Sequence, residues 1–217
     1  MQLYNKFKVV FSLFILIFTF TSCIELEEHI IINNDRSGSY AILLDLGIIS
    51  NNPFYTPNIP DGVKEFPDII KNAINGIDGI SDVKAVSTKS KYGVSFKFKN
   101  HKAFKKGLLE ISGLKNYGFI IPNYIKVGKH RFVKKNIGYI IKQQIQSQKD
   151  SPLLEEYMGM KIADLIKISS IIETPNKIKS VKRNVTVSNA KGTNSVKIKT
   201  TLSDILNGAE TGVLIKY

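Results

Sequence analysis

Residues 92–111 read YGVSFKFKNHKAFKKGLLEI, and this stretch combines the pattern of a strand with that of a helix. From Val94 to Lys99 apolar side chains alternate with polar ones, which is typical of a strand that buries one face and leaves the other in water. Asn100 can then cap a helix in which apolar residues share a face at i, i+4 and i+7, starting from Phe104. The stretch therefore predicts a strand whose apolar face packs against the helix that follows it.

The same order of strand pairs and short helices recurs along the chain. Turn residues between apolar runs predict hairpins at 30–44, 83–98 (turning at 91–93), 117–134 and 185–199. Apolar side chains at helical spacing predict helices at 69–77, 100–111, 137–145, 153–158 and 203–207. Further strands are expected at 165–173 and 213–217, whereas 46–66 is too rich in proline and asparagine for regular structure.

These elements predict an α+β fold, with an antiparallel sheet built from successive hairpins and helices on one of its faces. The recurrence of strand pair and helix fits two ferredoxin-like halves, divided near 115–150. It fits one continuous sheet as well.

The first 22 residues are organised as a bacterial secretory signal. Two lysines precede a nearly unbroken apolar run of 12 residues, Val9–Phe20, which leads to Cys23, the only cysteine in the chain. Because a membrane-spanning helix needs about 20 residues, an uncleaved anchor is the weaker interpretation. We therefore expect 1–22 to be a signal peptide and 23–217 to be the mature, lipid-anchored domain.

The residues before the cysteine suggest how the chain is anchored. Phe20-Thr21-Ser22-Cys23 resembles the lipobox at which signal peptidase II cuts before a diacylglyceryl-modified cysteine. Phe20 stands where the usual lipobox has Leu, and if it blocks this peptidase, ordinary cleavage leaves Cys23 as a free thiol. The resemblance implies that lipid on Cys23 attaches the protein to a membrane.

A second resemblance extends into the mature chain. An acidic strand after the cysteine, the Asp-x-Ser-Gly turn at 35–38 and the stretch ETPNKI at 173–178 are similar to a loosely defined class of small bacterial envelope lipoproteins. The class implies a fold and a cellular location, and no activity is known for it.

The residues after Cys23 bear on the location. Ile24, rather than Asp, follows the cysteine, which favours the outer membrane over the inner one. The acidic residues Glu25, Glu27 and Glu28 are similar to the signal that sends some lipoproteins to the cell surface. They also fit a solvated leader or the exposed face of a first strand, so the choice between the two leaflets stays open.

The composition is strongly basic, with a net charge of +13, yet only three of the 31 basic residues are arginine. Arginine is the residue that recognises phosphate in a bidentate manner. The excess of lysine, together with the many isoleucines and asparagines, is typical of an AT-rich genome. An exported protein also has little access to nucleic acid, so we expect no nucleic-acid partner.

The sequence contains no motif with catalytic or metal-binding content. Asn33, Asp35 and Ser37 match the first half of a calcium loop, but the acid required at its twelfth position is replaced by Leu44. The histidines lie far apart, at positions 29, 101 and 130. We therefore predict no catalytic residue, no metal site and no cofactor.

Lysines that alternate with apolar residues are the candidate binding surface. Lys97, Lys99, Lys197 and Lys199 are predicted on the water-facing side of the sheet, where they can bind an anionic glycan or lipid. The simpler interpretation is that they solvate that face.

Three functions are weighed on these observations. The first is a non-enzymatic, lipid-anchored lipoprotein that serves as a binding or assembly component of the outer membrane, in contact with the membrane through Cys23 and with an envelope protein. The second is an anion- or glycan-binding module that uses the lysine face. The third is a hydrolase whose site is not visible in the sequence.

Overall fold

The computed structural model describes residues 24–47, 61–112, 124–147, 156–157, 160–182, 186–187 and 192–217. Several predictions lie outside these ranges. They include the signal peptide, Cys23 itself, most of the helix expected at 153–158 and part of the turn in the last hairpin.

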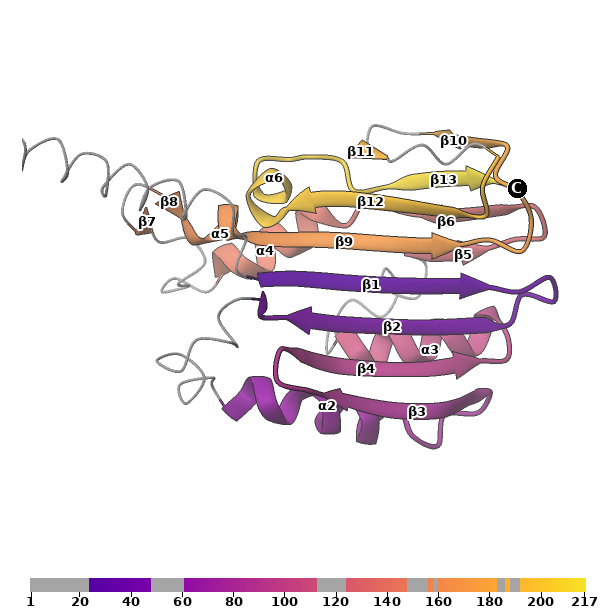
Figure 1. Cartoon of the computed structure of the whole chain (residues 1–217), viewed down its shortest axis with the longest axis horizontal. Helices are drawn as coiled ribbons and strands as arrows, with labels where there is room; N and C mark the ends of the chain where they lie inside the picture. The colour runs from indigo at the N-terminus through magenta and orange to yellow at the C-terminus, as the bar shows by residue number, and fades with distance from the viewer. Residues whose placement is uncertain are drawn as a thin grey trace, which may run out of the picture.

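Most strands join one large sheet, which Figure 1 shows face-on. Its seven strands follow the order β11-β12-β9-β1-β2-β4-β3. Their bounds are β1 Ile24–Ile32, β2 Gly38–Asp45, β3 Ile80–Ser87, β4 Lys91–Phe98, β9 Ile166–Glu173, β11 Thr186–Val187 and β12 Ser195–Thr201. All neighbouring strands are antiparallel except β1 and β9, which are parallel, so the sheet is mixed.

A second sheet of four strands lies behind and beside β12 and β9 in Figure 1. Its strand order is β10-β13-β6-β5, and all three pairings are antiparallel. The bounds are β5 Ile125–Val127, β6 Arg131–Lys134, β10 Ser180–Lys182 and β13 Val213–Lys216. A small third sheet pairs β7 (Glu156–Tyr157) with β8 (Met160–Lys161).

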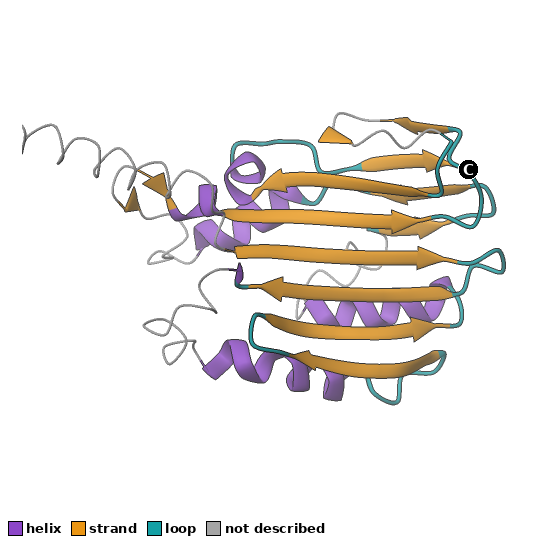
Figure 2. Cartoon of the chain, viewed as in Figure 1, coloured by secondary structure: helices purple, strands orange, loops and turns teal. Residues whose placement is uncertain are grey.

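Helices complete the layer behind the large sheet, as Figure 2 shows. The bounds are α2 Asp61–Ile74, α3 His101–Ser112, α4 Gly138–Ser147, α5 Ile162–Leu165 and α6 Leu202–Leu206. Helices α2 and α3 contact β3 and β4, whereas α6 contacts β9, β12 and α4. The large sheet is therefore covered on one face, partly by helices and partly by the second sheet.

The stretch at 92–111 folds as its pattern predicts. Phe96 and Phe98 on β4 and Phe104 on α3 are at most 2% exposed, and the rings of Phe98 and Phe104 stack with centroids 4.4 Å apart. Asn100 caps α3, because its side-chain oxygen accepts a hydrogen bond from the backbone N–H of Ala103 at 3.0 Å. Burial of these aromatic rings fixes α3 against the sheet.

The α+β fold class is confirmed, with a difference in the sheet. The parallel pairing of β1 with β9 joins strands that are more than 130 residues apart in the sequence, from Ile32 to Ile166, so hairpins alone do not account for the sheet. Buried side chains from both sheets and from α2 and α3 form one hydrophobic core. The seven-stranded sheet is undivided, and the separate four-stranded sheet packs on the same core.

Three local predictions were wrong. Helix α2 begins at Asp61 and runs through Pro67, whose buried ring packs in the interior and outweighs the loss of one helical hydrogen bond. The turn of the second hairpin lies at 88–90, because residues 91–93 already pair with β2 and β3. Residues 156–157, expected in a helix, form β7.

Candidate functional site

A cavity of about 380 Å³ lies between the large sheet and the layer that covers it. This volume is within the range of about 300–1,000 Å³ found for small-molecule sites. The cavity is lined by Leu26, Glu28, Tyr40, Ile42, Phe66, Leu108, Ile111, Ser112, Tyr124, Lys134, Ile137, Ile141, Ile168, Ser170, Ile198, Thr200, Ile205 and Thr211. Most of these side chains are apolar, and they come from both sheets and from α2, α3, α4 and α6.

Successive rows of inward-facing residues on β1, β9 and β12 define the two ends of the cavity. The outermost of these rows is half-buried and consists of Leu26, Ile168 and Thr200. The next row is buried and consists of Glu28, Ser170 and Ile198. The row after that fills the core and consists of Ile30, Ile172 and Val196. The cavity therefore has its mouth at the end of the sheet where β1 begins and its floor at the level of Glu28.

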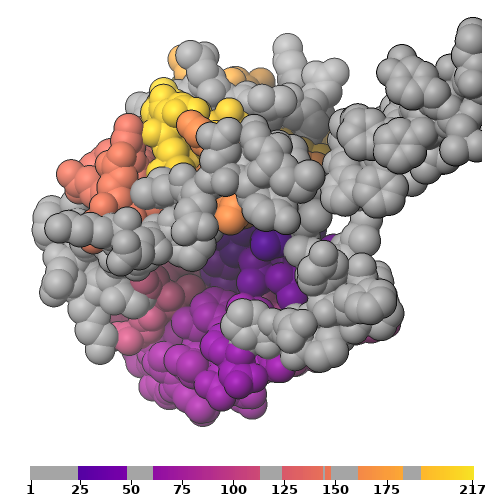
Figure 3. All heavy atoms as spheres, turned by 90° about the vertical axis from the view of Figure 1, so that its left-hand side faces the viewer, coloured from indigo at the N-terminus to yellow at the C-terminus, as the bar shows by residue number. Residues whose placement is uncertain are grey.

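Figure 3 views the molecule from this end. The indigo segment, which contains β1 and β2, lies recessed between α2 on one side and the orange and yellow segments on the other. The hollow agrees with the gradient of exposure along the rows.

A compact cluster of polar side chains forms the floor. The Lys134 ammonium on β6 is paired with the Glu28 carboxylate on β1 and donates to Ser170 Oγ at 2.5 Å. Ser170 in turn donates to Glu28 Oε2 at 2.7 Å, and the Tyr40 hydroxyl donates to Glu28 Oε1 at 3.1 Å. The ring centroid of Tyr124 lies 5.5 Å from Lys134 Nζ. Glu28 is 9% and Lys134 7% exposed, so the ion pair is buried.

The pKa shifts in this cluster stabilise the charged forms of its two ions. Burial opposes the charge on Lys134, but the nearby Glu28 carboxylate outweighs it and holds the Lys134 pKa above its ordinary value. Burial likewise opposes the charge on Glu28, yet Lys134 and the hydrogen bonds lower the Glu28 pKa. Burial and the Glu28 charge raise the pKa of Tyr124 to about 12 and that of Tyr40 well above its usual value. At neutral pH the cluster therefore contains one cation, one anion and neutral hydroxyls.

Sequence reasoning missed this cluster. Glu28 was grouped with acids of a solvated leader or strand face, and Lys134 was not among the four selected lysines. Strand alternation offers a signal, since Glu28 shares a face with Ile30 and Lys134 shares one with Phe132. A charged residue at an inward position of each of two strands indicates a buried pair.

The four selected lysines lie on or beside the opposite face. Lys97 is on β4, Lys197 and Lys199 are on β12, and Lys99 follows the end of β4. Strands β2, β1 and β9 separate the two sets, so the structure does not bring them together. A second, shallower hollow of about 350 Å³ on this face includes Lys97 and Asp82, which form an exposed ion pair at 2.7 Å.

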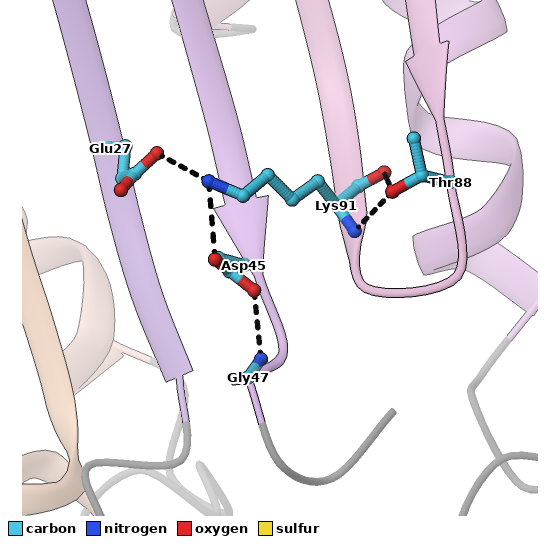
Figure 4. A network of polar contacts seen from close by, with 5 residues as sticks. All are labelled: Glu27, Asp45, Gly47, Thr88 and Lys91. Carbon is cyan, nitrogen blue, oxygen red and sulfur yellow. Dashed lines mark hydrogen bonds and ion pairs between the residues drawn. The ribbon is translucent and has the colours of Figure 1, made fainter. Parts of the chain in front are cut away.

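Acidic residues also occupy this outer face. Figure 4 shows Lys91 Nζ between Glu27 Oε2, at 3.0 Å, and Asp45 Oδ2, at 3.3 Å. Thr88 Oγ accepts from the backbone N–H of Lys91 and fixes the turn that leads into β4. The outer face therefore carries paired charges of both signs in addition to lysines.

Neither a metal cluster nor a membrane-spanning helix is found in the described part of the chain. No group of three His, Cys, Asp or Glu residues there has the arrangement to hold a metal ion. No helix within the described ranges is both long and apolar enough to cross a membrane. His101 begins α3, its Nδ1 is buried and has no hydrogen-bond partner among the described residues, and burial lowers its pKa to about 4.

Comparison with known proteins gives a similarity of fold alone. No protein-family model matches the chain, and no curated protein sequence matches it. The fold is similar to the NMR structure of the folded domain of the LppM protein of Mycobacterium tuberculosis, with 9% identity, 90% of each chain covered and a TM-score of 0.43. The cavity, rather than this similarity, is the basis for the functional proposal.

Proposed function

We propose that this chain is a lipid-anchored protein of the bacterial envelope that binds a small apolar or amphiphilic molecule in its cavity. The observation that carries the proposal is the cavity itself, which combines a volume of about 380 Å³ and an apolar lining with a polar floor. Concave sites of this size, lined by apolar side chains with a few fixed polar groups, are typical of ligand binding.

Binding fits the floor better than catalysis does. General acid–base catalysis requires a group whose pKa lies near the working pH. In this cluster the Lys134 pKa is raised and the Glu28 pKa is lowered, so both move away from neutrality. Near neutral pH Lys134 therefore keeps its proton and Glu28 stays ionised, so neither is suited to proton transfer, and we propose a non-enzymatic binding role.

The anchor in this proposal is a lipid on Cys23, attached in the outer membrane. The apolar run before the cysteine supports export, and the small residues Thr21 and Ser22 support lipid attachment. The first described strand begins at Ile24, immediately after Cys23 in the sequence. A chain anchored there would keep its whole described fold outside the membrane.

Ligand binding is tested with the fluorescent apolar probe N-phenyl-1-naphthylamine. The mature chain carrying Cys23→Ser cannot be acylated and still contains every described element, since β1 begins at Ile24. We expect saturable probe binding that Ile168→Trp, which fills the mouth, abolishes. The matched control is Ile171→Trp, on the same strand but on the outer face, which should leave binding intact. Equal effects of the two variants, or no saturable binding, would contradict the proposal.

The anchor is tested by intact-mass analysis of the membrane fraction. We expect a mature N-terminus at Cys23 with the mass of a diacylglyceryl group added, and release from the membrane in Cys23→Ala. A different N-terminus, or a Cys23→Ala protein that still carries lipid, would show that the anchor is assigned wrongly.

A further inference from the structure

The floor of the cavity is electrically balanced. Lys134 contributes one positive charge and Glu28 one negative charge, and the high pKa values of Tyr40 and Tyr124 keep both phenols neutral. A ligand that reaches the floor therefore meets strong local dipoles but no net charge.

A second ion at this floor would be costly. Glu28 and Lys134 already neutralise each other, so a ligand carboxylate would have to compete with Glu28 for Lys134. A ligand ammonium would have to compete with Lys134 for Glu28. Removing an additional charge from water without a new partner costs several kcal/mol in a buried site. The floor therefore selects against charged head groups of either sign.

The hydrogen bonds at the floor favour a hydroxyl group. A carboxylate has about four lone-pair positions, and the described partners of Glu28 donate from Lys134, Ser170 and Tyr40. About one position is left on the Oε1 side, where only the Tyr40 bond is found among the described residues. A ligand hydroxyl can donate there without changing the charge.

The remainder of the cavity fits an acyl chain. Leu26 and Ile168 lie between the floor and the mouth, Ile42 flanks Glu28 at the floor, and Ile141 and Ile205 add further apolar lining. Burial of each methylene group against these side chains is favourable, so an acyl chain gains affinity without polar contacts.

We infer that the ligand is a single-chain amphiphile with an uncharged, hydroxyl-bearing head group, such as a monoacylglycerol, whose head contacts the Glu28–Lys134–Ser170 cluster. This inference rests on the proposed binding function and specifies the class of ligand. The acyl chain points from the floor toward the mouth, beside the start of β1.

The inference is tested by competition with the fluorescent probe. Three ligands with the same chain length are compared on the mature Cys23→Ser chain, below their micelle concentrations: monopalmitoylglycerol, palmitate and hexadecylamine. We expect the uncharged ligand to displace the probe at a concentration at least about tenfold lower than either charged one, which corresponds to about 1.4 kcal/mol.

The second part of the experiment changes a charge at the floor of the cavity. Glu28→Gln leaves Lys134 without its carboxylate, so palmitate should gain at least about tenfold relative to monopalmitoylglycerol. The matched control is Glu27→Gln on the same strand, whose side chain pairs with Lys91 on the outer face. This control should keep the wild-type preference.

The outcomes separate the two proposals. The ligand class is wrong if the probe binds but palmitate or hexadecylamine displaces it at the same or a lower concentration than monopalmitoylglycerol does. It is also wrong if none of the three displaces the probe. In both cases the binding function stands. If the probe does not bind at all, the binding function itself fails. Should Glu28→Gln not fold, the comparison of the three head groups on the unchanged floor decides the matter.

Discussion

Lys134 and Glu28 form a buried ion pair that joins the four-stranded sheet to the seven-stranded one, although 106 residues separate them in the sequence. Lys134 lies on β6 and Glu28 on β1, and Ser170 on β9 binds both. Together with Ser170, the pair therefore links three segments that are distant in the sequence, at the floor of the cavity.

Removing the lysine should destabilise the protein strongly. Lys134→Met leaves the Glu28 carboxylate buried and unpaired, and breaking a buried pair in this way costs about 3–5 kcal/mol. The double variant Glu28→Gln with Lys134→Met should recover much of that loss, because no isolated charge remains. The measurement is the free energy of unfolding in urea. The neighbouring, exposed Lys135→Met serves as the control, and a loss at Lys134 no larger than at Lys135 would rule out the paired arrangement.

The aromatic core between β4 and α3 gives the second prediction. Phe104 is 0% exposed and packs on Phe98 and Tyr40. Phe104→Ala should lower the free energy of unfolding by about 3–5 kcal/mol, since a large cavity is created. Ile69→Ala on the exposed side of α2 should change it by no more than about 0.5 kcal/mol. A loss below about 1 kcal/mol for Phe104→Ala would place that ring at the surface.

His101 should make stability depend on acid pH. Burial, aided by the positive charges of Lys105, Lys126 and Arg36, lowers its pKa from 6.5 to about 4 in the folded chain. As the pH falls from 6.5 toward 4, the unfolded chain binds a proton that the folded chain does not, so stability decreases over this window. In His101→Gln the melting temperature should fall less across this window than in the wild type. An identical response of His101→Gln and the wild type would contradict the assignment.

Charge reversal on the outer face should leave the fold nearly unchanged. Lys97→Glu with Lys199→Glu changes two exposed side chains on separate strands, and the only described ion pair lost is that of Lys97 with Asp82. We expect a melting temperature close to that of the wild type and no steeply salt-dependent binding to anionic liposomes or acidic polysaccharide. If the wild type binds these anions in a salt-sensitive manner and the double variant does not, the anion-binding function would be supported instead.

Local sequence patterns predicted many of the helices and strands correctly. The alternation in β4 and the helical spacing from Phe104 predicted both elements and their common core, because each depends on residues close in the sequence. The start of α2 was predicted wrongly because proline usually stands at the beginning of a helix and not within it. In the folded protein, the burial of Pro67 compensates for its unfavourable position inside α2. Pairing between distant strands, such as β1 with β9, leaves no comparable local signal.

The cavity could not be predicted from the sequence for a similar reason. Its lining comes from many separate helices, strands and loops, which only the fold brings together, and no two of its polar residues are neighbours in the chain. Glu28 and Lys134 each break the apolar pattern of an inward-facing strand side. Their partnership, however, depends on how the two sheets stack.

The start of β1 at Ile24 has a kinetic consequence for the proposed function. The residue expected to carry the lipid immediately precedes the strand whose first inward-facing side chains border the mouth of the cavity. For a chain anchored at Cys23, the opening lies next to the bilayer surface. An acyl chain that moves from bilayer to cavity then need not enter bulk water, where each exposed methylene would add about 0.8 kcal/mol to the barrier. Exchange of ligand would therefore be fast while the protein is membrane-bound and slow once it is released.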